Sequence, residues 1–322
     1  MRKTLEFIKR NSSIILTSHE GADADGIGAE LLMAHILENM GKEVRIINAE
    51  PTVSRYAFMN PKEKIEVWDE AKHGGLLKKS ALIIVDTSDE YHIGVLKAIL
   101  PKVKETLVID HHEPNPFSNL AGYIDPAASS TCEIIIDIAK KARITLDTAC
   151  ATAAFAGISY DTGSFAYKKT TAKTFKAALA LIKAGAVPSQ IYSALNENDS
   201  LGALLLQKQV LSSLKLHNLG RIAVQILKKE DLEATGGEFD EAEAFINVPL
   251  KSREVEVSIF IKENRKGIVR CSLRSKGQVN VSKIAQQFGG GGHATAAGFK
   301  SSQGIDETLV RVLEKIKSVL DT

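Results

Sequence analysis

Short apolar runs alternate with longer amphipathic segments through the first part of the chain. Buried strands are predicted by the runs at residues 13–17, 43–48, 81–85 and 106–109. Helical spacing predicts helices at residues 1–10, 27–40, 130–142, 147–159 and 171–184, the last closed by Gly185 and Pro188. Strands that alternate with helices build βαβ units, so we expect an α/β domain with a parallel sheet.

The pattern changes after residue 200. A helical segment at residues 201–216 has no neighbouring strands in the sequence and is expected to connect two domains. Beyond it, strands separated by short turns are predicted at residues 221–227, 242–248, 255–261 and 267–273. One face of a further helix carries Val281, Ile284, Ala285 and Phe288, and a last helix is predicted at residues 306–320. We therefore expect an N-terminal α/β domain at 1–198, a helical connector at 199–218 and a smaller α/β domain with a mixed sheet at 219–322.

Composition narrows the class of protein. The 322 residues carry a net charge of +2, so no bulk field marks a binder of duplex DNA or membranes. No apolar run approaches the roughly 20 residues of a membrane span, and charges interrupt the N-terminal segment where a signal peptide would be continuously apolar. The cysteines lack CxxC spacing and are predicted to be buried, reduced thiols. We expect a cytoplasmic protein that does not associate with membranes.

Acidic residues and histidines stand where predicted strands and helices end. They are His19, Asp23, Asp25, Asp86, Asp110, His111, His112 and Asp161. Each has an ordinary alternative explanation, because an aspartate after a strand often caps the next helix or forms a turn. Several loops that offer Asp or His at one edge of a parallel sheet are more informative, because α/β proteins build their sites at the carboxyl ends of the strands.

The chemistry of these side chains favours metal ions. Carboxylate and imidazole ligands without thiolates suit Mn²⁺, or else Fe, Co or Mg²⁺, better than structural zinc. One ion cannot use all the candidate ligands, so two divalent ions bridged by a carboxylate are predicted from His19, Asp23, Asp25, Asp86, His111 and Asp161. Asp23 and Asp25 alternate in a presumed extended loop, which would direct them to different ions. His112 is expected to point away from the metals toward a phosphate, and Asp110 to fix a histidine tautomer.

A glycine-rich stretch near the end of the chain has its own chemistry. Four glycines at 289–292 precede His293, and the N–H groups of such a stretch can approach an anion without obstruction from Cβ atoms. A helix C-cap would need only one glycine, so we favour binding. Arg274 can bind a phosphate through two hydrogen bonds. Arg270 is expected on the same face of the strand, but it is the weaker candidate for phosphate binding. The predicted substrate-binding residues are Arg274, Ser275, Gly291, Gly292, His293 and Arg270.

Taken in order, these motifs resemble those of the DHH phosphoesterases. The matching residues are His19-x3-Asp23-x-Asp25, Asp86, Asp110-His111-His112 and Asp161, and residues 271–275 and 289–293 resemble the DHHA1 domain that follows in one branch. The resemblance spans nearly the whole chain and is strongest to the NrnA-type oligoribonucleases with 3′-phosphoadenosine 5′-phosphate phosphatase activity. Ala22 and Gly28-Ala29 depart from the Pro and Gly-Ser that the family often has there.

The resemblance implies a role for each motif residue. His19, Asp23 and Asp86 would hold one Mn²⁺. Asp25, His111 and Asp161 would hold the other, with Asp86 shared between the two, and His112 would face the phosphate.

The resemblance also implies an activity. It is the hydrolysis of short RNAs or linear dinucleotides to nucleoside 5′-monophosphates, and of 3′-phosphoadenosine 5′-phosphate to AMP, in a cleft between the domains. A cyclic dinucleotide phosphodiesterase is the nearest alternative. An inorganic pyrophosphatase would not need the glycine-rich pocket, and a non-catalytic nucleotide sensor would be expected to have lost some ligands. The apolar helices are consistent with a homodimer.

Overall fold

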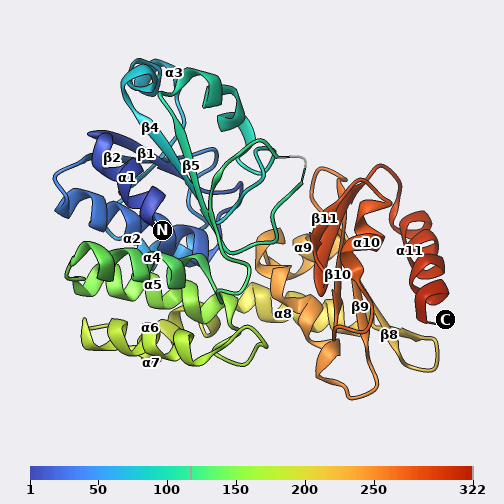
Figure 1. The fold of residues 1–322 in the computed structure, drawn as a ribbon. Coiled ribbons are helices and arrows are strands. Elements are labelled where there is room, and N and C mark those ends of the chain that lie inside the picture. Colours follow the sequence, from blue (N-terminus) through green and yellow to red (C-terminus); the bar gives the residue numbers. More distant parts are fainter. Residues whose placement is uncertain (117, 321–322) are drawn as a thin grey trace. The chain divides into compact units, whose positions relative to one another are not determined.

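The computed structural model describes residues 1–116 and 118–320 (Figure 1). The chain forms two compact units, Met1–Asn198 and Asp199–Thr322. Each has its own sheet and its own apolar core. Among the described residues, no helix combines the length and the apolar character that crossing a membrane requires.

A six-stranded sheet in the order β3-β2-β1-β4-β5-β6 forms the centre of the first unit. Its strands are all parallel and comprise β1 (Ser13–Thr17), β2 (Glu43–Asn48), β3 (Ile65–Val67), β4 (Ala81–Val85), β5 (Thr106–Asp110) and β6 (Gly122–Ile124). The four longer strands are those predicted from the apolar runs. The edge strands β3 and β6 have three residues each and carry too little pattern to be predicted.

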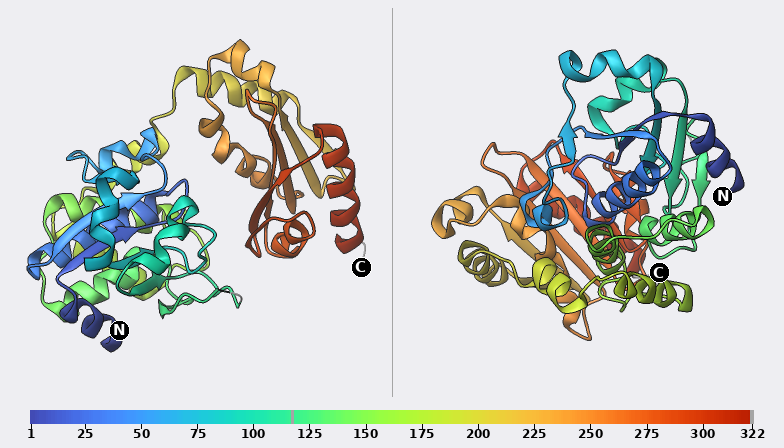
Figure 2. Two further views of the ribbon diagram at one scale, coloured as in Figure 1. Left: turned by 90° about the horizontal axis from the view of Figure 1, so that it is seen from above. Right: turned by 90° about the vertical axis from the view of Figure 1, so that its left-hand side faces the viewer.

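Helices and 3-10 segments cover both faces of this sheet (Figure 2). The helices are α1 (Arg2–Arg10), α2 (Ala24–Asn39), α3 (Glu70–His73), α4 (Thr131–Ala142), α5 (Thr148–Asp161), α6 (Ala172–Lys183) and α7 (Pro188–Asn196). The 3-10 segments are η1 (Ser54–Met59), η2 (Gly74–Lys79) and η3 (Gly94–Lys102). Alternate residues of β4 face the two layers: Ile83 packs with α2 and α4, whereas Leu82 and Ile84 pack beneath η2 and η3.

Two helix ends of the first unit differ from the prediction. Helix α2 begins at Ala24 rather than residue 27, because the Asp23 carboxylate accepts hydrogen bonds from the N–H groups of Asp25 and Gly26. Pro188 begins α7 instead of only closing the preceding helix. Proline suits this position because the first turn of a helix does not need its N–H group.

The sheet of the second unit is mixed, as predicted, with the order β11-β12-β10-β9-β8-β7. It comprises β7 (Lys215–His217), β8 (Ile222–Leu227), β9 (Val257–Glu263), β10 (Val269–Ser275), β11 (Gly291–His293) and β12 (Ala296–Ser301). Strands β8 and β9 are parallel and all other pairs are antiparallel. One face packs on α10 (Val281–Gln286) and α11 (Ile305–Leu320). The other packs on α8 (Leu201–Ser212), α9 (Lys229–Thr235) and η4 (Phe239–Asn247), which η5 (Pro249–Lys251) follows.

Two predictions for the second unit were wrong, and one stretch forms a strand that was not predicted. Residues 242–248 were predicted as a strand but lie mainly in η4, whose buried Ala242, Phe245 and Ile246 follow a helical spacing. The helix predicted at 201–216 ends at Ser212, and β7 follows. The glycine-rich stretch ends as strand β11, because its backbone pairs with the unpredicted β12.

Candidate active site

The eight candidate residues of the first unit come together where β1, β4 and β5 end. His19 follows β1, Asp86 follows β4, and the remaining positions lie at the start of α2, the end of β5 and the end of α5. Six of them form two groups in which the ligand atoms all lie within 4.8 Å of one another: His19 with Asp23 and Asp86, and Asp25 with His111 and Asp161. Asp86 and His111 also form such a group with His112. The structure thus brings together residues that are up to 142 positions apart in sequence, from His19 to Asp161.

Asp86 lies between the two groups. Its Oδ2 atom is 3.6 Å from His19 Nε2, and its Oδ1 atom is 3.5 Å from His111 Nε2. One carboxylate therefore presents one oxygen to each group. This is the geometry that a bridging ligand of two metal ions requires.

His111 provides a test of whether a cation suits this place. The side chain is buried, and among the described residues neither ring nitrogen makes a hydrogen bond. Its Nε2 atom faces carboxylate oxygens of Asp161 at 2.8 Å, Asp86 at 3.5 Å and Asp25 at 4.0 Å. An imidazole nitrogen surrounded by carboxylates is an oxygen- and nitrogen-rich donor set that fits Mn²⁺ or a similar ion.

Asp86 also has an unusual backbone. Its φ angle is +63°, in the left-handed region that residues other than glycine rarely occupy. The N–H group of Asp86 donates to Ile109 O at 3.0 Å, which extends the pairing of β4 with β5 past the end of the strand. The sheet thus holds a strained residue at the point where the two ligand groups meet.

The N-terminus of α4 fixes the two buried carboxylates. The N–H groups of Thr131 and Cys132 donate to the two oxygens of Asp25 at 2.6 and 3.1 Å. The Thr131 hydroxyl donates to Asp86 Oδ1 at 2.9 Å. Thr131 was not among the predicted site residues. Its partners Asp25 and Asp86 lie 106 and 45 positions earlier in the chain, so no local sequence pattern indicates these contacts.

Glu133 anchors this helix end. The Ser130 hydroxyl accepts from the Glu133 N–H group and caps α4. The buried Glu133 carboxylate, however, accepts hydrogen bonds from the hydroxyls of Ser129 at 2.6 Å and Thr174 at 2.7 Å. It therefore ties the start of α4 to α6 and keeps Thr131 in place.

Two glycines allow α2 and α5 to approach each other beside Asp25. A Cβ atom on Gly157 would lie 2.9 Å from Asp25 Oδ1 and 2.7 Å from Cys132 Sγ. A Cβ atom on Gly28 would lie 2.6 Å from the backbone oxygen of Ala153. All three distances are shorter than real contacts of a Cβ atom, so the close approach requires glycine at these positions.

The concentration of carboxylates changes their acidity. Desolvation, followed by the charge of Asp161, raises the pKa of Asp25 to about 6. Desolvation, followed by the charge of Asp23, raises the pKa of Asp161 to about 8. The pKa of Asp86 is raised well above its usual value by burial and by Asp25. Without a cation the site therefore retains protons that a bound metal would displace.

Asp110 and His112 form a separate pair at the end of β5. Asp110 is fully buried, and its Oδ1 atom lies 2.7 Å from His112 Nδ1. Burial acts to raise the pKa of Asp110, but hydrogen bonds with His112 and Ser88 outweigh burial and lower it. The His112 side chain is one-third exposed and its Nδ1 lies 3.8 Å from Asp86 Oδ1. His112 thus lies beside Asp86 and His111, and its orientation toward a phosphate stays a prediction.

Asp23 and Asp25 face different groups for a reason other than the predicted one. Asp23 is the N-cap of α2, and Asp25 lies in the first helical turn and is fully buried. The turn of a helix, not an extended loop, separates their side chains.

In the second unit, the predicted binding residues lie on strands at one side of the sheet. Arg270 and Arg274 alternate with buried residues along β10 and share one face, as predicted. Gly292 and His293 in β11 pair with Ala297 and Ala296 of β12. Arg274 and His293 are half-buried, whereas Gly291 and Gly292 are exposed. The buried Ser275 hydroxyl donates to Val279 O at 2.6 Å, so it shapes the turn after β10.

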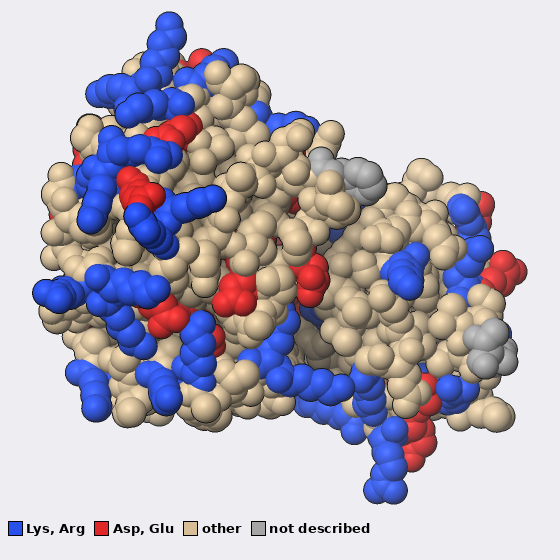
Figure 3. All heavy atoms as spheres, viewed as in Figure 1, with Lys and Arg blue, Asp and Glu red and all other residues tan. Residues whose placement is uncertain are grey.

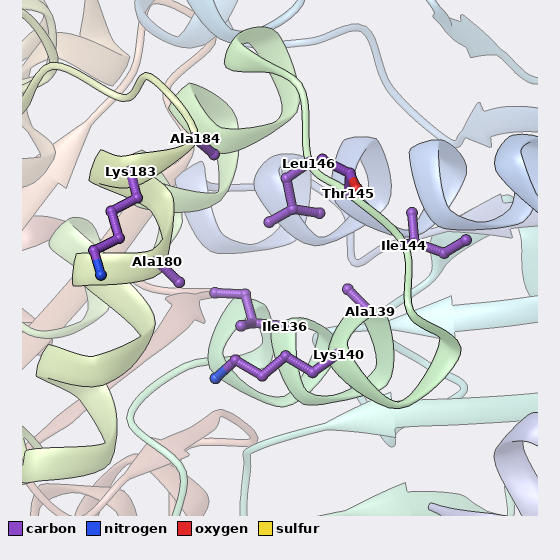
Figure 4. Close-up of a pocket in the computed structure, with 9 residues that line it drawn as sticks. All are labelled: Ile136, Ala139, Lys140, Ile144, Thr145, Leu146, Ala180, Lys183 and Ala184. Carbon is purple, nitrogen blue, oxygen red and sulfur yellow. The ribbon is translucent and has the colours of Figure 1, made fainter.

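One cavity of the first unit lies elsewhere. Its volume is about 480 Å³, and its lining comes from α4, α6 and the segment that follows α4, as Figure 4 shows. None of its lining residues belongs to the two ligand groups. The C-terminal turns of α4 and α6 border it with Lys140 and Lys183. The C-terminal end of a helix is the negative end of its dipole, and these lysines balance that negative charge. We therefore do not assign this cavity to an anionic substrate.

Charge on the surface agrees with the small net charge. Figure 3 shows Lys and Arg side chains mainly over the left part and along the lower margin of the visible face, with Asp and Glu among them. Any recognition of an anion must therefore come from local groups such as those described above.

Comparison with known proteins shows the family of this chain. Residues 13–158 match the model of the DHH family, N-terminal domain, and residues 220–322 match the DHHA1 domain. A probable bifunctional oligoribonuclease and PAP phosphatase NrnA from Streptococcus mutans is 31% identical over 303 residues, which cover 91% of each protein. The chain belongs to the DHH family. It is a hydrolase of phosphoester bonds, so the predicted fold class, family and enzyme class are confirmed.

Further relatives differ in the length that they share with this chain. The bifunctional oligoribonuclease and PAP phosphatase NrnA of Thermus thermophilus is 28% identical, over 99% of this chain and 94% of the relative. The cyclic-di-AMP phosphodiesterase GdpP of Bacillus subtilis is 29% identical over 98% of this chain, but only 48% of that protein is covered. The crystal structure of an exopolyphosphatase-related protein from Bacteroides fragilis has a TM-score of 0.91 at 24% identity, over 100% and 97% of the two chains. That structure shows the fold alone.

Proposed function

We propose that this protein is a two-metal phosphoesterase that hydrolyses short oligoribonucleotides to nucleoside 5′-monophosphates and 3′-phosphoadenosine 5′-phosphate to AMP. The observation that carries the proposal is the position of Asp86, with one oxygen toward each ligand group. The names of the relatives from Streptococcus mutans and Thermus thermophilus support the substrates.

The ligand sets follow from the two groups of side chains. His19, Asp23 and Asp86 would hold one ion, and Asp25, Asp86, His111 and Asp161 the other. Mn²⁺ suits this set best, because it contains carboxylates and imidazoles without a thiolate. Two such ions, when bound, supply an ionised water and neutralise the oxygens of a phosphate.

The side chains of this chain perform the remaining work. The Nδ1–H group of His112 donates a hydrogen bond to Asp110 Oδ1, which fixes the tautomer of the ring. We assign His112 to a phosphate oxygen, with transfer of a proton to the leaving oxygen. Thr131 and the N-terminus of α4 orient Asp25 and Asp86, so these carboxylates need not rearrange when substrate arrives.

In the second unit, we assign the binding of a second phosphate to Arg274, His293 and the glycines of β11. Exposed glycines and a half-buried arginine are suited to an anion. Arg270 has a smaller share, because its guanidinium lies over the Phe239 ring at 5.7 Å. Ser275 contributes through the turn after β10.

A cyclic dinucleotide phosphodiesterase is the second candidate. The observation in its favour is the 29% identity to the cyclic-di-AMP phosphodiesterase of Bacillus subtilis across nearly this whole chain. The chain spans about half the length of that relative, so whether it shares the relative's substrate needs measurement.

A parallel assay separates these candidates. Purified protein with Mn²⁺ is given pApA, cyclic di-AMP, 3′-phosphoadenosine 5′-phosphate and a 24-residue RNA, and product formation is followed by chromatography. We expect turnover of pApA and 3′-phosphoadenosine 5′-phosphate and little turnover of the long RNA. Faster turnover of cyclic di-AMP than of pApA would establish the second candidate instead.

The bridging role of Asp86 has its own test. Asp86→Ala should lose activity and should bind Mn²⁺ at less than two equivalents in an EPR titration. Asp89→Ala, four positions from the end of β4, is the matched control and should keep both properties. Full activity in Asp86→Ala would show that the proposed centre is not the catalytic one.

Two further expectations stay predictions. A cytoplasmic location and a homodimer are consistent with the sequence. The outer face of α6, where Phe175, Leu179 and Ile182 are exposed, is the apolar surface that a second copy could cover.

A further inference from the structure

A second cluster of metal-ligating side chains lies far along the helices that carry active-site aspartates. Helix α2 begins beside Asp25 and carries His35 near its other end. Helix α5 ends at Asp161, and its N-terminal end carries Asp147 as the cap and Cys150 in the first turn. His35, Asp147 and Cys150 each offer one ligand atom, and these atoms all lie within 4.8 Å of one another.

The hydrogen bond of His35 defines which of its nitrogens faces the cluster. His35 Nε2 lies 2.8 Å from the backbone oxygen of Thr145. A carbonyl oxygen only accepts, so Nε2 carries the hydrogen and Nδ1 of the neutral ring has a lone pair. Metal-binding histidines commonly donate their second ring N–H group to a carbonyl in this way.

The separation of His35 and Asp147 is informative. His35 Nδ1 is 3.5 Å from Asp147 Oδ2, which is too long for a good N–H···O hydrogen bond. Two donor atoms at about 2.0–2.1 Å from a tetrahedral zinc ion are themselves roughly 3.3–3.4 Å apart. The pairs of Asp86 with His111 and with His19, at 3.5 and 3.6 Å, show the same spacing in the active site.

The other two residues are also prepared for a ligand. Asp147 Oδ1 accepts from the Cys150 N–H group at 2.8 Å as the cap of α5, which leaves Oδ2 on the side of His35. Cys150 is 5% exposed, so its sulfur lies within the protein surface next to the carboxylate. A protonated His35 paired with Asp147 would explain these two residues but would give Cys150 no role.

We propose that His35, Asp147 and Cys150 form a third metal site that takes Zn²⁺ or a similar thiophilic divalent cation, with water as a fourth ligand. A thiolate distinguishes this site from the thiolate-free active centre and favours zinc over manganese. Since burial, and then the charge of Asp147, raise the pKa of the Cys150 thiol to about 12, binding would release a proton.

The site would act on the enzyme through helix packing. His35 follows Asp25 by ten residues, or about 15 Å of helix. An ion that joins His35 of α2 to the start of α5 would hold the two helices together far from Asp25 and Asp161. Zinc would therefore stabilise the helix pair without contact with substrate.

The experiment uses full-length protein whose active centre has first been filled with Mn²⁺. Co²⁺ is then titrated, and the thiolate-to-cobalt charge-transfer absorption in the near ultraviolet is followed. We expect one equivalent to give this absorption, and zinc to displace it. The variant Cys150→Ser should lose the absorption, and His35→Gln should weaken binding at least tenfold. Cys271→Ser, which removes a buried thiol of the other unit, is the matched control and should behave as wild type.

Further variants separate binding from folding. Asp147→Asn retains a good helix cap but loses the carboxylate charge, so it should fold normally and bind Co²⁺ more weakly. Zinc should raise the midpoint of thermal unfolding of the wild type and of Cys271→Ser, but not of Cys150→Ser. An absorption that persists in Cys150→Ser, or that only Cys132→Ser removes, would overturn the proposal, as would a wild type without the absorption.

Discussion

The two units hold their candidate binding groups in opposite ways. In the first unit, Asp25 and Asp86 are buried and receive hydrogen bonds from the N-terminus of α4. In the second, Arg274 and His293 are half-buried and Gly291 is exposed. Bond-breaking chemistry needs ligands held to within a fraction of an ångström, whereas a phosphate grip tolerates side chains that adjust. The difference predicts that small changes of packing will damage the first unit more than the loss of a whole side chain damages the second.

The largest effect is expected at Gly157. In Gly157→Ala, the new Cβ atom would lie 2.9 Å from Asp25 Oδ1 and would push the carboxylate or α5 aside. We expect kcat to fall by about 100-fold or more, as displacements of about 1 Å commonly cause. Gly75→Ala, where a Cβ atom meets nothing within 4 Å, is the control. Wild-type kcat in a folded Gly157→Ala protein would show that the tight packing is not needed for activity.

Thr131 is expected to have the next largest effect. In Thr131→Val, the side chain keeps its shape but Asp86 loses a hydrogen bond. Mn²⁺ affinity, measured by EPR titration, should fall by about 10- to 100-fold, the usual cost of losing a group that orients a ligand. Thr131→Ser should restore most of it. Equal affinities for the valine and serine variants would rule out the hydroxyl as the orienting group.

A smaller effect is expected from pH. The pKa values of Asp25 and Asp161, about 6 and about 8, lie above the usual aspartate value, so the metal-free folded protein holds protons that an unfolded chain has lost. Mn²⁺ must displace these protons, and its affinity should rise with pH up to about 8, by about tenfold per pH unit for each proton. The metal-free protein should lose stability over the same rise in pH. Calorimetry measures both, and a dissociation constant that does not change between pH 6 and 8 would contradict the shifts.

The smallest effect is expected in the second unit. Arg274→Ala should raise KM for pApA by about tenfold, the cost of one charge-assisted hydrogen bond, with little change in kcat. Arg265 lies in the turn after β9 and forms an ion pair with Glu238. Arg265→Ala is the control and should leave KM unchanged. A large fall in kcat for Arg274→Ala would contradict the expectation that the second unit binds substrate without taking part in the bond-breaking step.

The sequence was informative where the chemistry lies at strand ends. Asp86, Asp110 and His111 follow continuous apolar runs, and a parallel sheet necessarily brings the ends of its strands to one edge. The resemblance then supplied the division of the ligands into two sets, which stays a prediction; in the structure their side chains gather at this edge of the sheet.

Other features could not be predicted because they depend on partners distant in sequence. Thr131 acts through Asp25 and Asp86, and only the docking of α4 brings them together. Strand β11 has two glycines and no apolar pattern, so its pairing with β12 defines it. Residues 242–248 have enough apolar residues for a strand, but Ala242, Phe245 and Ile246 fit one face of a 3-10 segment.

At position 86, the residue that the active site needs is also one that strains the backbone, so stability and activity make opposite demands there. Glycine adopts a φ of +63° without strain, so Asp86→Gly would relieve both the backbone and the repulsion among buried carboxylates. A selection for thermal stability alone would therefore tend to remove the residue on which both ligand groups depend. Engineering of a more robust enzyme from this scaffold has to keep position 86 fixed and seek its gains elsewhere.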